Sequence, residues 1–203
     1  MKDKKEKKNF FFNSFFNSFF SNDYVDIFFI GTILTLLSFF IDSYVVMFMS
    51  IIQNFILIDI FSIITMLGNI EFFIPISIVI SIFFFARKKR IFGLWLSIIV
   101  VGIIVFFMKL IINRPRPFVS QNLVAIINTN MSSFPSGHAM IVFSLVPFMT
   151  KNFPNHKNYF FAIAILVAFS RIYLNVHYLS DIVAGGFIGY LVGLFFSRIE
   201  NKK

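Results

Sequence analysis

Long apolar runs separated by short charged or polar stretches dominate the chain. An apolar helix of about 20 residues crosses the hydrocarbon core of a membrane, and six runs approach or reach that length. They are Val25–Ile41, Gly68–Ala86, Ile91–Ile112, Ser136–Phe153, Asn158–Leu174 and Leu179–Ser197. The pattern predicts an all-α, polytopic membrane protein with six transmembrane helices.

One further stretch, Ser43–Leu67, is apolar but interrupted by Gln53, Asn54 and Asp59. It could be a seventh span or a helix lying in the membrane interface, and the positive charges distinguish the two. Six spans with an internal N-terminus put fourteen Lys and Arg residues inside and four outside, whereas seven spans give nine and nine. Because Lys and Arg accumulate in cytoplasmic loops, we expect six spans and place Ser43–Leu67 as an interfacial or re-entrant helix on the outer face.

The composition is that of a membrane protein. The 203 residues are 58% hydrophobic, 20% aromatic and 13% charged, with 33 Phe and a mean hydropathy of +0.86, whereas soluble domains carry about 25% charged residues. The net charge of +9 would suggest nucleic-acid binding in a soluble chain. In a membrane chain it marks cytoplasmic loops, so we expect the bilayer as partner and no nucleic acid. The absence of cysteine excludes disulfides and a cysteine nucleophile.

The chain contains no linker long enough to divide it, so we expect one membrane domain over residues 25–198, with a cytoplasmic tail at 199–203. Residues 1–24 begin with the basic stretch Met1–Lys8 and continue with a Phe-rich repeat, Phe10–Ser21. The four-residue period of the repeat favours an amphipathic helix at the cytoplasmic surface, and a partner-binding tail is the alternative. We expect a multi-pass protein of the cytoplasmic membrane.

The four basic residues expected on the outer face all lie at the ends of spans: Lys109, Arg114, Arg116 and Arg171. His138 and His177 belong to the same face, and Asp181 is the only acid expected beside them. Ionisable groups at membrane depth are costly and usually functional, and cations without matching carboxylates favour an anionic ligand. Phosphate suits this set, because Arg binds its oxygens bidentately and Lys supplies a compact charge. For Arg114 an interfacial anchor and a phosphate contact are equally compatible with the sequence.

The stretch Ser136-Gly137-His138 opens the fourth predicted span, directly after Pro135. Free backbone N–H groups and the positive end of a helix point toward an anion at such a position. Ser136 is a suitable N-cap, and Gly137 allows a close backbone approach.

His177 and Asp181 are four residues apart and become neighbours if this stretch is helical. An Asp bonded to one imidazole nitrogen fixes the tautomer and leaves the other lone pair free, which makes a nucleophile or a base. Attack by His177 on phosphorus gives a phosphohistidine; His138 supplies the leaving-group proton and then activates water. Charge on the phosphoryl oxygens would be neutralised by Lys109, Arg116 and Arg171. Because no Asp/Glu cluster is available for a metal, we expect metal-independent turnover and no cofactor.

The spacing of three motifs resembles the signature of the type 2 phosphatidic acid phosphatase family. The motifs are Lys109 followed after six residues by Arg116-Pro117; Pro135-Ser136-Gly137-His138; and Ser170-Arg171, five residues, His177, three residues, Asp181. The resemblance covers roughly Ile91 to Gly193. It implies an all-helical membrane phosphatase that acts on lipid phosphates or pyrophosphates without metal, with its site on the outer face. It also implies phosphate contacts from Lys109, Arg116, Ser136, Gly137 and Arg171.

Asn175 and Leu179 stand where many members of this family carry Gly and Pro. Asn tolerates left-handed backbone conformations better than most residues, so the sequence still permits a tight turn before His177. C-terminal to the third motif, Gly185, Gly189 and Gly193 recur every four residues. This spacing predicts that the last helix packs closely against a neighbouring helix.

The substrate is less clearly indicated than the reaction. A small six-span bacterial member without further domains most resembles undecaprenyl pyrophosphate phosphatases, which recycle the cell-wall carrier lipid. Phosphatidylglycerophosphate or phosphatidic acid hydrolysis is the alternative. A transporter or channel is an alternative of another class, but it predicts charges spread through the depth of several spans, whereas here they cluster at one end.

Overall fold

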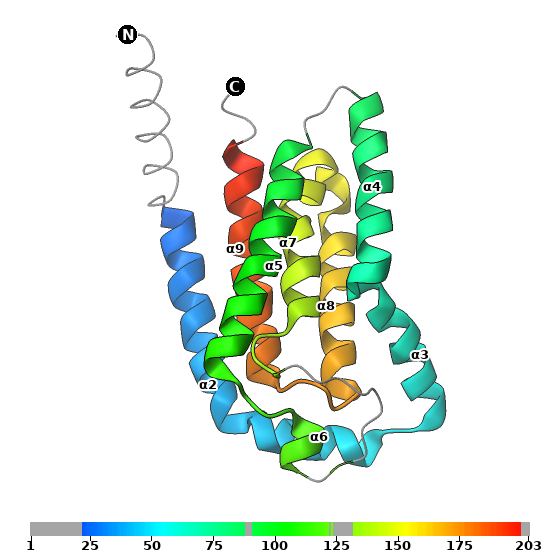
Figure 1. The fold of residues 1–203 in the computed structure, drawn as a ribbon, viewed down its shortest axis with the longest axis vertical. Helices are drawn as coiled ribbons and strands as arrows, with labels where there is room; N and C mark the ends of the chain where they lie inside the picture. Colours follow the sequence, from blue (N-terminus) through cyan, green and yellow to red (C-terminus); the bar gives the residue numbers. More distant parts are fainter. Residues whose placement is uncertain (1–21, 88–90, 122, 124–131, 200–203) are drawn as a thin grey trace.

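The structure is a computed structural model that describes residues 22–87, 91–121, 123 and 132–199. In this part of the chain every regular element is a helix. The order is α2 (Asn22–Ile52), α3 (Phe55–Thr65), η1 (Met66–Gly68), α4 (Ile70–Ala86), α5 (Phe92–Ile112), α6 (Pro117–Ser120), α7 (Gly137–Asn152), η2 (Pro154–His156), α8 (Lys157–Tyr173) and α9 (Leu179–Ile199). Figure 1 shows α4, α5, α7, α8 and α9 side by side as a bundle, with α2 beside α9.

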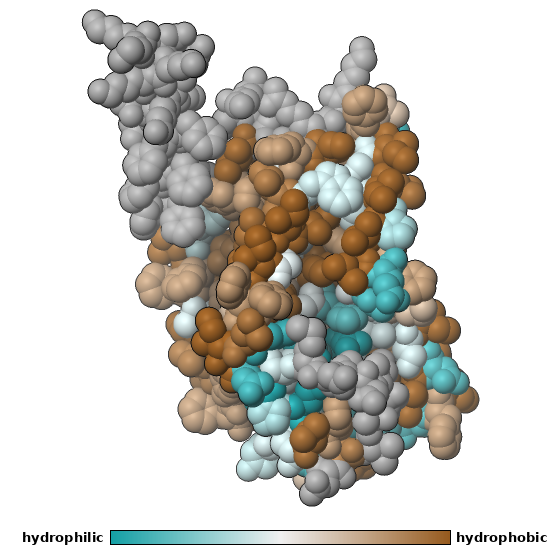
Figure 2. All heavy atoms as spheres, in the orientation of Figure 1, coloured by the Kyte–Doolittle hydropathy of each residue, from teal (hydrophilic) through white to brown (hydrophobic). Residues whose placement is uncertain are grey.

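Three stretches of the described residues are long and apolar enough to cross a membrane: Tyr24–Ile52, Phe92–Ser120 and Leu179–Ile199. The pair α3 and α4, bent by 54° at its junction, makes a fourth if it is counted as one span. Large apolar side chains are exposed along these helices, and Figure 2 shows them covering much of one face, above a lower band of hydrophilic residues. The protein is therefore an all-helical, multi-pass membrane protein.

The predicted end of the first helix at Ile41 is wrong. Helix α2 continues to Ile52, and Figure 1 shows its C-terminal part crossing the lower end of the bundle before α3 turns upward beside α8. The stretch Ser43–Leu67 is thus the end of α2, all of α3 and most of η1, not one separate helix. No Pro or Gly interrupts α2 between Ile41 and Ile52, so local sequence gives the helix no reason to stop.

The break between α2 and α3 is held by polar groups. The Asn54 side chain accepts a hydrogen bond from the Leu57 backbone N–H at 2.9 Å and so caps α3. The Tyr173 hydroxyl accepts from the Asn54 N–H at 3.1 Å and donates to the Ile52 carbonyl at 3.2 Å. Tyr173 therefore ties the end of α8 to the turn between α2 and α3.

The other predicted helices agree with the structure to within about two residues at each end. The predicted basic and Phe-rich segment lies outside the described residues, except that residues 22–24 open α2. Of the predicted tail, Ile199 ends α9 and the remainder is likewise outside the described part.

Helix α7 lies at the centre of the bundle and contacts α5, α8 and α9, the last most extensively. Three glycines of α9 face the α7 backbone, as predicted. A Cβ placed on Gly185, Gly189 or Gly193 would lie 2.6, 2.1 and 2.1 Å from the carbonyl oxygens of Ser136, Met140 and Ser144. The two backbones therefore approach with no side chain between them on this face.

Candidate active site

The three motifs meet at the lower end of the bundle in Figure 1, where α5 and α8 end and α7 and α9 begin. Each predicted residue lies at a helix terminus or in the adjoining loop. Lys109 is in the last turn of α5, Arg116 precedes α6, Ser136 caps α7, Arg171 is in the last turn of α8, His177 is in the loop after it, and Asp181 is in the first turn of α9. The residues that the sequence separates by up to 72 positions are thereby brought to one end of the fold.

His177 and Asp181 form the expected pair. The His177 Nδ1 atom lies 3.2 Å from Asp181 Oδ2, and both side chains are almost fully buried. The same carboxylate oxygen accepts hydrogen bonds from the Tyr178 backbone N–H at 2.9 Å and from the Ser133 hydroxyl. Asn175 has a φ of 55°, in the left-handed region, so the chain does turn tightly before His177, as the sequence permits.

Burial lowers the pKa of His177 to about 3, against the opposing effect of Asp181. The imidazole is therefore neutral at physiological pH. With the ring proton on Nδ1, facing Asp181, the Nε2 atom carries the lone pair. Nε2 lies 3.3 Å from Nη1 of Arg116, so the lone pair is on the side of the ring where the cations gather.

Three cations line this end of the bundle, and each is buried: Lys109, Arg116 and Arg171 are 7%, 7% and 3% exposed. Lys109 donates to the Ser132 carbonyl, and Arg116 donates to the Val176 carbonyl at 2.7 Å. Arg171 donates from Nη1 to the Thr65 hydroxyl at 2.6 Å, while its buried Nε has no hydrogen-bond partner among the described residues. The charges of Arg116 and Arg171 both act on Lys109. Mutually repelling buried cations favour occupation by an anion.

The start of α7 lies against the same cluster. The Ser136 hydroxyl accepts from the Ala139 N–H at 3.4 Å, and the Ser136 N–H donates to the Asp181 carbonyl at 3.0 Å. His138 interacts electrostatically with His177 and with the three cations. A Cβ on Gly68 would lie 2.9 Å from the His138 ring, so η1 packs directly on that ring. The fold therefore brings both histidines together with Lys109, Arg116 and Arg171, as predicted.

Sequence reasoning missed three residues of the site. Asp42 reaches it from α2, so the expectation that Asp181 is the only acid there is wrong. The sequence does contain a signal for Asp42, which is the one carboxylate in the apolar stretch from Ile27 to Ile58. A charged residue in such a stretch needs a charged or polar partner elsewhere in the fold. Ser133 and Thr65 carry none, since hydroxyl residues are common and follow no motif here.

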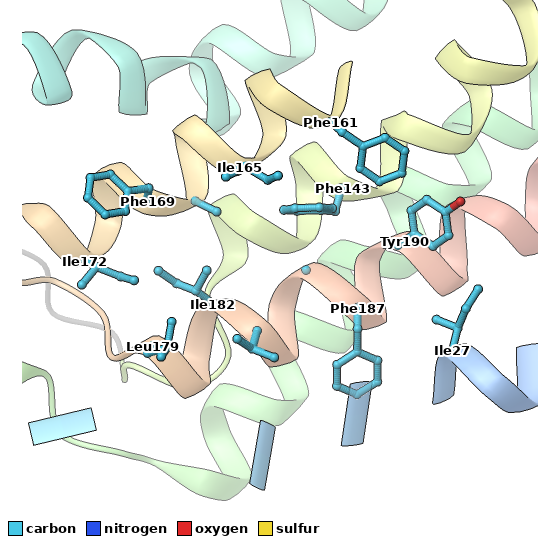
Figure 3. Close-up of a pocket in the computed structure, with 13 residues that line it drawn as sticks. Ile27, Phe143, Phe161, Ile165, Phe169, Ile172, Leu179, Ile182, Phe187 and Tyr190 are labelled. Atoms are coloured by element: carbon cyan, nitrogen blue, oxygen red, sulfur yellow. The ribbon is translucent and has the colours of Figure 1, made fainter. Parts of the chain in front are cut away.

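Two apolar cavities flank α7 inside the bundle. One, of about 610 Å³, lies between α2, α7, α8 and α9; Figure 3 shows Leu179 and Ile172 at one end of it and Tyr190 and Ile27 at the other. The second, of about 260 Å³, is lined by Val142, Val146 and Met149 of α7 together with residues of α4 and α8. Apolar groups can therefore lie between the helices on either side of α7.

The fold and site together define a membrane phosphohydrolase: an all-helical membrane protein with an Asp-oriented neutral imidazole among buried cations. Residues 90–203 match the PAP2 superfamily, and the chain belongs to that family, the type 2 phosphatidic acid phosphatases. The membership expected from the three motifs is thus confirmed, and with it the enzyme class, a hydrolase of phosphate esters.

Three similar proteins are informative. Phosphatidylglycerophosphatase B of Bacillus subtilis is 32% identical over 153 residues, covering 68% of this chain and 73% of the relative. An undecaprenyl-diphosphatase of Sulfolobus acidocaldarius is 28% identical and covers 66% of each chain. The crystal structure of a transmembrane PAP2-type phosphatidylglycerolphosphate phosphatase from Bacillus subtilis superposes with a TM-score of 0.75 at 27% identity, over 88% of this chain and 96% of that one.

Proposed function

We propose that the protein is a metal-independent phosphatase of lipid phosphates or pyrophosphates that works through a phosphohistidine on His177. One observation carries the proposal: Asp181 holds His177 Nδ1 at 3.2 Å, while Nε2 is directed toward Arg116 at 3.3 Å, among buried cations. A neutral, oriented imidazole is a nucleophile, and the cations are where the phosphoryl charge has to be neutralised.

In the first step His177 Nε2 attacks phosphorus and the bond from phosphorus to the lipid oxygen breaks. His138 gives its proton to that oxygen. In the second step His138 takes a proton from water, which attacks the phosphohistidine and releases phosphate and the free imidazole. Throughout, the phosphoryl oxygens are held by Lys109, Arg116, Arg171 and the backbone at Ser136 and Gly137.

Metal ions usually serve phosphoryl transfer by neutralising charge on the transferred group. Here three buried cations and the N-terminus of α7 supply positive charge at the same place. These groups support turnover in the presence of a chelator.

The mechanism predicts that His177→Ala loses at least about a thousandfold in phosphate release, because the nucleophile is gone. The measurement is phosphate release by detergent-solubilised protein with chelator present. His156→Ala is the matched control, since His156 is exposed in η2 at the opposite end of the bundle. Activity retained by His177→Ala would rule out the phosphohistidine.

With radiolabelled substrate, His138→Ala should accumulate labelled protein if enough of the first step survives, and His177→Ala should not be labelled.

For the natural substrate we propose undecaprenyl pyrophosphate, in recycling of the cell-wall carrier, with phosphatidylglycerophosphate as the second candidate. The archaeal relative named an undecaprenyl-diphosphatase supports the first, and the Bacillus subtilis relative and its fold neighbour support the second. Initial rates on these two lipids, phosphatidic acid and diacylglycerol pyrophosphate separate them. A kcat/KM for phosphatidylglycerophosphate well above that for undecaprenyl pyrophosphate would reverse our order.

We further propose six spans, α2, α4, α5, α7, α8 and α9, in the cytoplasmic membrane with the site facing outside. Helix α2 starts and α9 ends at the end of the bundle opposite the site (Figure 1), and the basic residues Arg87, Lys151, Lys157 and Arg198 lie at that end. The positive-inside rule makes that end cytoplasmic.

The orientation has a direct test, because the natural chain contains no cysteine. Val119→Cys places an exposed thiol beside the site, and Asn155→Cys places one at the other end. A membrane-impermeant maleimide added to intact cells should label Val119→Cys alone, and both variants after permeabilisation. Labelling of Asn155→Cys alone in intact cells would invert the proposed topology.

A further inference from the structure

Asp181 has two carboxylate oxygens, and the mechanism above uses one. The other, Oδ1, accepts a hydrogen bond from Arg114 Nη1 at 2.7 Å. The second terminal nitrogen of Arg114 donates to Asp42 Oδ2, also at 2.7 Å. Arg114 therefore bridges two carboxylates, one at the start of α9 and one on α2.

The Arg114 guanidinium is fixed in its plane as well as at its ends. Its central carbon lies 3.8 Å from the centre of the Tyr178 ring and 4.8 Å from that of the Phe39 ring. Stacking of this kind restricts an arginine to one orientation. Nη1 also donates to the Ser180 hydroxyl at 2.7 Å. With these partners, the guanidinium is directed at protein groups, not at the phosphate site.

Asp42 completes the arrangement from α2. Its Oδ1 accepts from the Ser180 backbone N–H at 2.9 Å, and its Oδ2 accepts from the Ser180 hydroxyl. The Ser180 N–H belongs to the first turn of α9, where backbone donors have no partner within the helix. Asp42 thus caps α9 from a helix 138 residues away in sequence, and does so beside Asp181.

We propose that Arg114 and Asp42 are positioning residues for His177, acting through the Asp181 carboxylate; this rests on the proposed function. Arg114 holds Oδ1, so that Oδ2 is turned toward His177 Nδ1, the Ser133 hydroxyl and the Tyr178 N–H. Without Arg114 the Oδ1 atom loses its charged partner, so the carboxylate is held from the Oδ2 side alone, and the nearby Asp42 charge loses its Arg114 counter-ion. Asp181 is 0% exposed, so water does not readily replace the lost partner.

The test measures kcat and KM for Arg114→Gln, Arg114→Lys and Asp42→Asn on the preferred lipid in detergent. We expect Arg114→Gln to lower kcat by about 10- to 100-fold, the usual effect of a misplaced catalytic group, with KM within about twofold. Arg114→Lys should recover part of the loss. Loss of a phosphate contact, as in Arg171→Gln, should raise KM as well as lower kcat, because Arg171 holds the phosphoryl group both in the bound substrate and in the transition state. Arg87→Gln, an exposed arginine at the opposite end, is the control and should change neither constant.

A double-mutant cycle with Asp181→Asn distinguishes positioning from general stabilisation. If Arg114 acts through Asp181, Arg114→Gln has little further effect once Asp181 is changed. Multiplying effects, or a KM change without a kcat change, would overturn the inference. If Arg114→Gln does not fold, the isosteric Asp42→Asn variant carries the same cycle. Failure of the proposed function itself would show separately, as activity retained by His177→Ala.

Discussion

Helix α9 packs in two very different ways on its two sides. Toward α7 it presents Gly185, Gly189 and Gly193, and the backbones are in direct contact. Toward α8 it presents larger side chains, among them Ile182 and Tyr190, which line the apolar cavity of about 610 Å³ in Figure 3. One helix therefore has a face with no room for a methyl group and a face with an open cavity.

The tight packing lies on the face of α9 where the relative positions of two site residues are set. His138 is the second residue of α7, and Asp181 is the third of α9. Contact between the two backbones, with the hydrogen bond from the Ser136 N–H to the Asp181 carbonyl at 3.0 Å, fixes these residues relative to each other. Group transfer depends on such fixed geometry. Helix α8 contributes Arg171 through a long side chain, so its spacing from α9 is under less constraint.

Of the substitutions that compare the two faces of α9, Gly189→Ala is expected to have the largest effect on stability. Its Cβ would lie 2.1 Å from the Met140 carbonyl oxygen and 2.8 Å from the carbonyl carbon, and neither backbone atom can move away alone. Separating the helices should cost about 3 kcal/mol or more. We expect the midpoint of thermal unfolding in detergent to fall by several degrees, followed through the fluorescence of the single tryptophan, Trp95.

Gly189→Ala should also reduce kcat/KM, because His138 and Asp181 lie on the helices that are forced apart. The activity loss should persist at temperatures where the variant is fully folded. A variant with unchanged unfolding and unchanged activity would show that α7 and α9 can separate freely, and that the tight face does not position the site.

Much of the fold follows from local sequence. Apolar runs end at charged residues, so five of six helices were predicted to within about two residues. The three motifs likewise predicted that His138, His177 and Asp181 lie at the site, because each motif spaces its residues over one helix end or one short connection between helices. The end of α2 was missed because Asp42 looks like a helix end locally, whereas its partners Arg114 and Ser180 lie 72 and 138 residues away.

The partners of Arg114 could not be predicted from local sequence either. Its position between Lys109 and Arg116 fits a phosphate contact and an interfacial anchor equally well, and only the tertiary fold directs it to two carboxylates. The cavity beside α9 had no sequence signal either. Its lining residues are apolar, as are most residues of a span, and whether they meet or leave a space depends on the distance between helices.

The smallest effect is expected from Gly186→Ala, one residue away from the tight face. Gly186 lines the cavity, and a Cβ there would lie 3.4 Å from the Phe143 ring, an ordinary contact with a side chain that can adjust. Replacing a helical glycine by alanine also lowers the conformational entropy of the unfolded chain, which stabilises by about 0.4–1 kcal/mol. We therefore expect an unfolding midpoint unchanged or slightly raised in the Trp95 assay, and kcat/KM within about twofold. Gly186→Ala and Gly189→Ala add the same methyl group to the same helix, so the difference between their unfolding midpoints reports which face of α9 receives it. Equal destabilisation by both would mean that α9 tolerates no added side chain on either side, and that its two faces are not distinct.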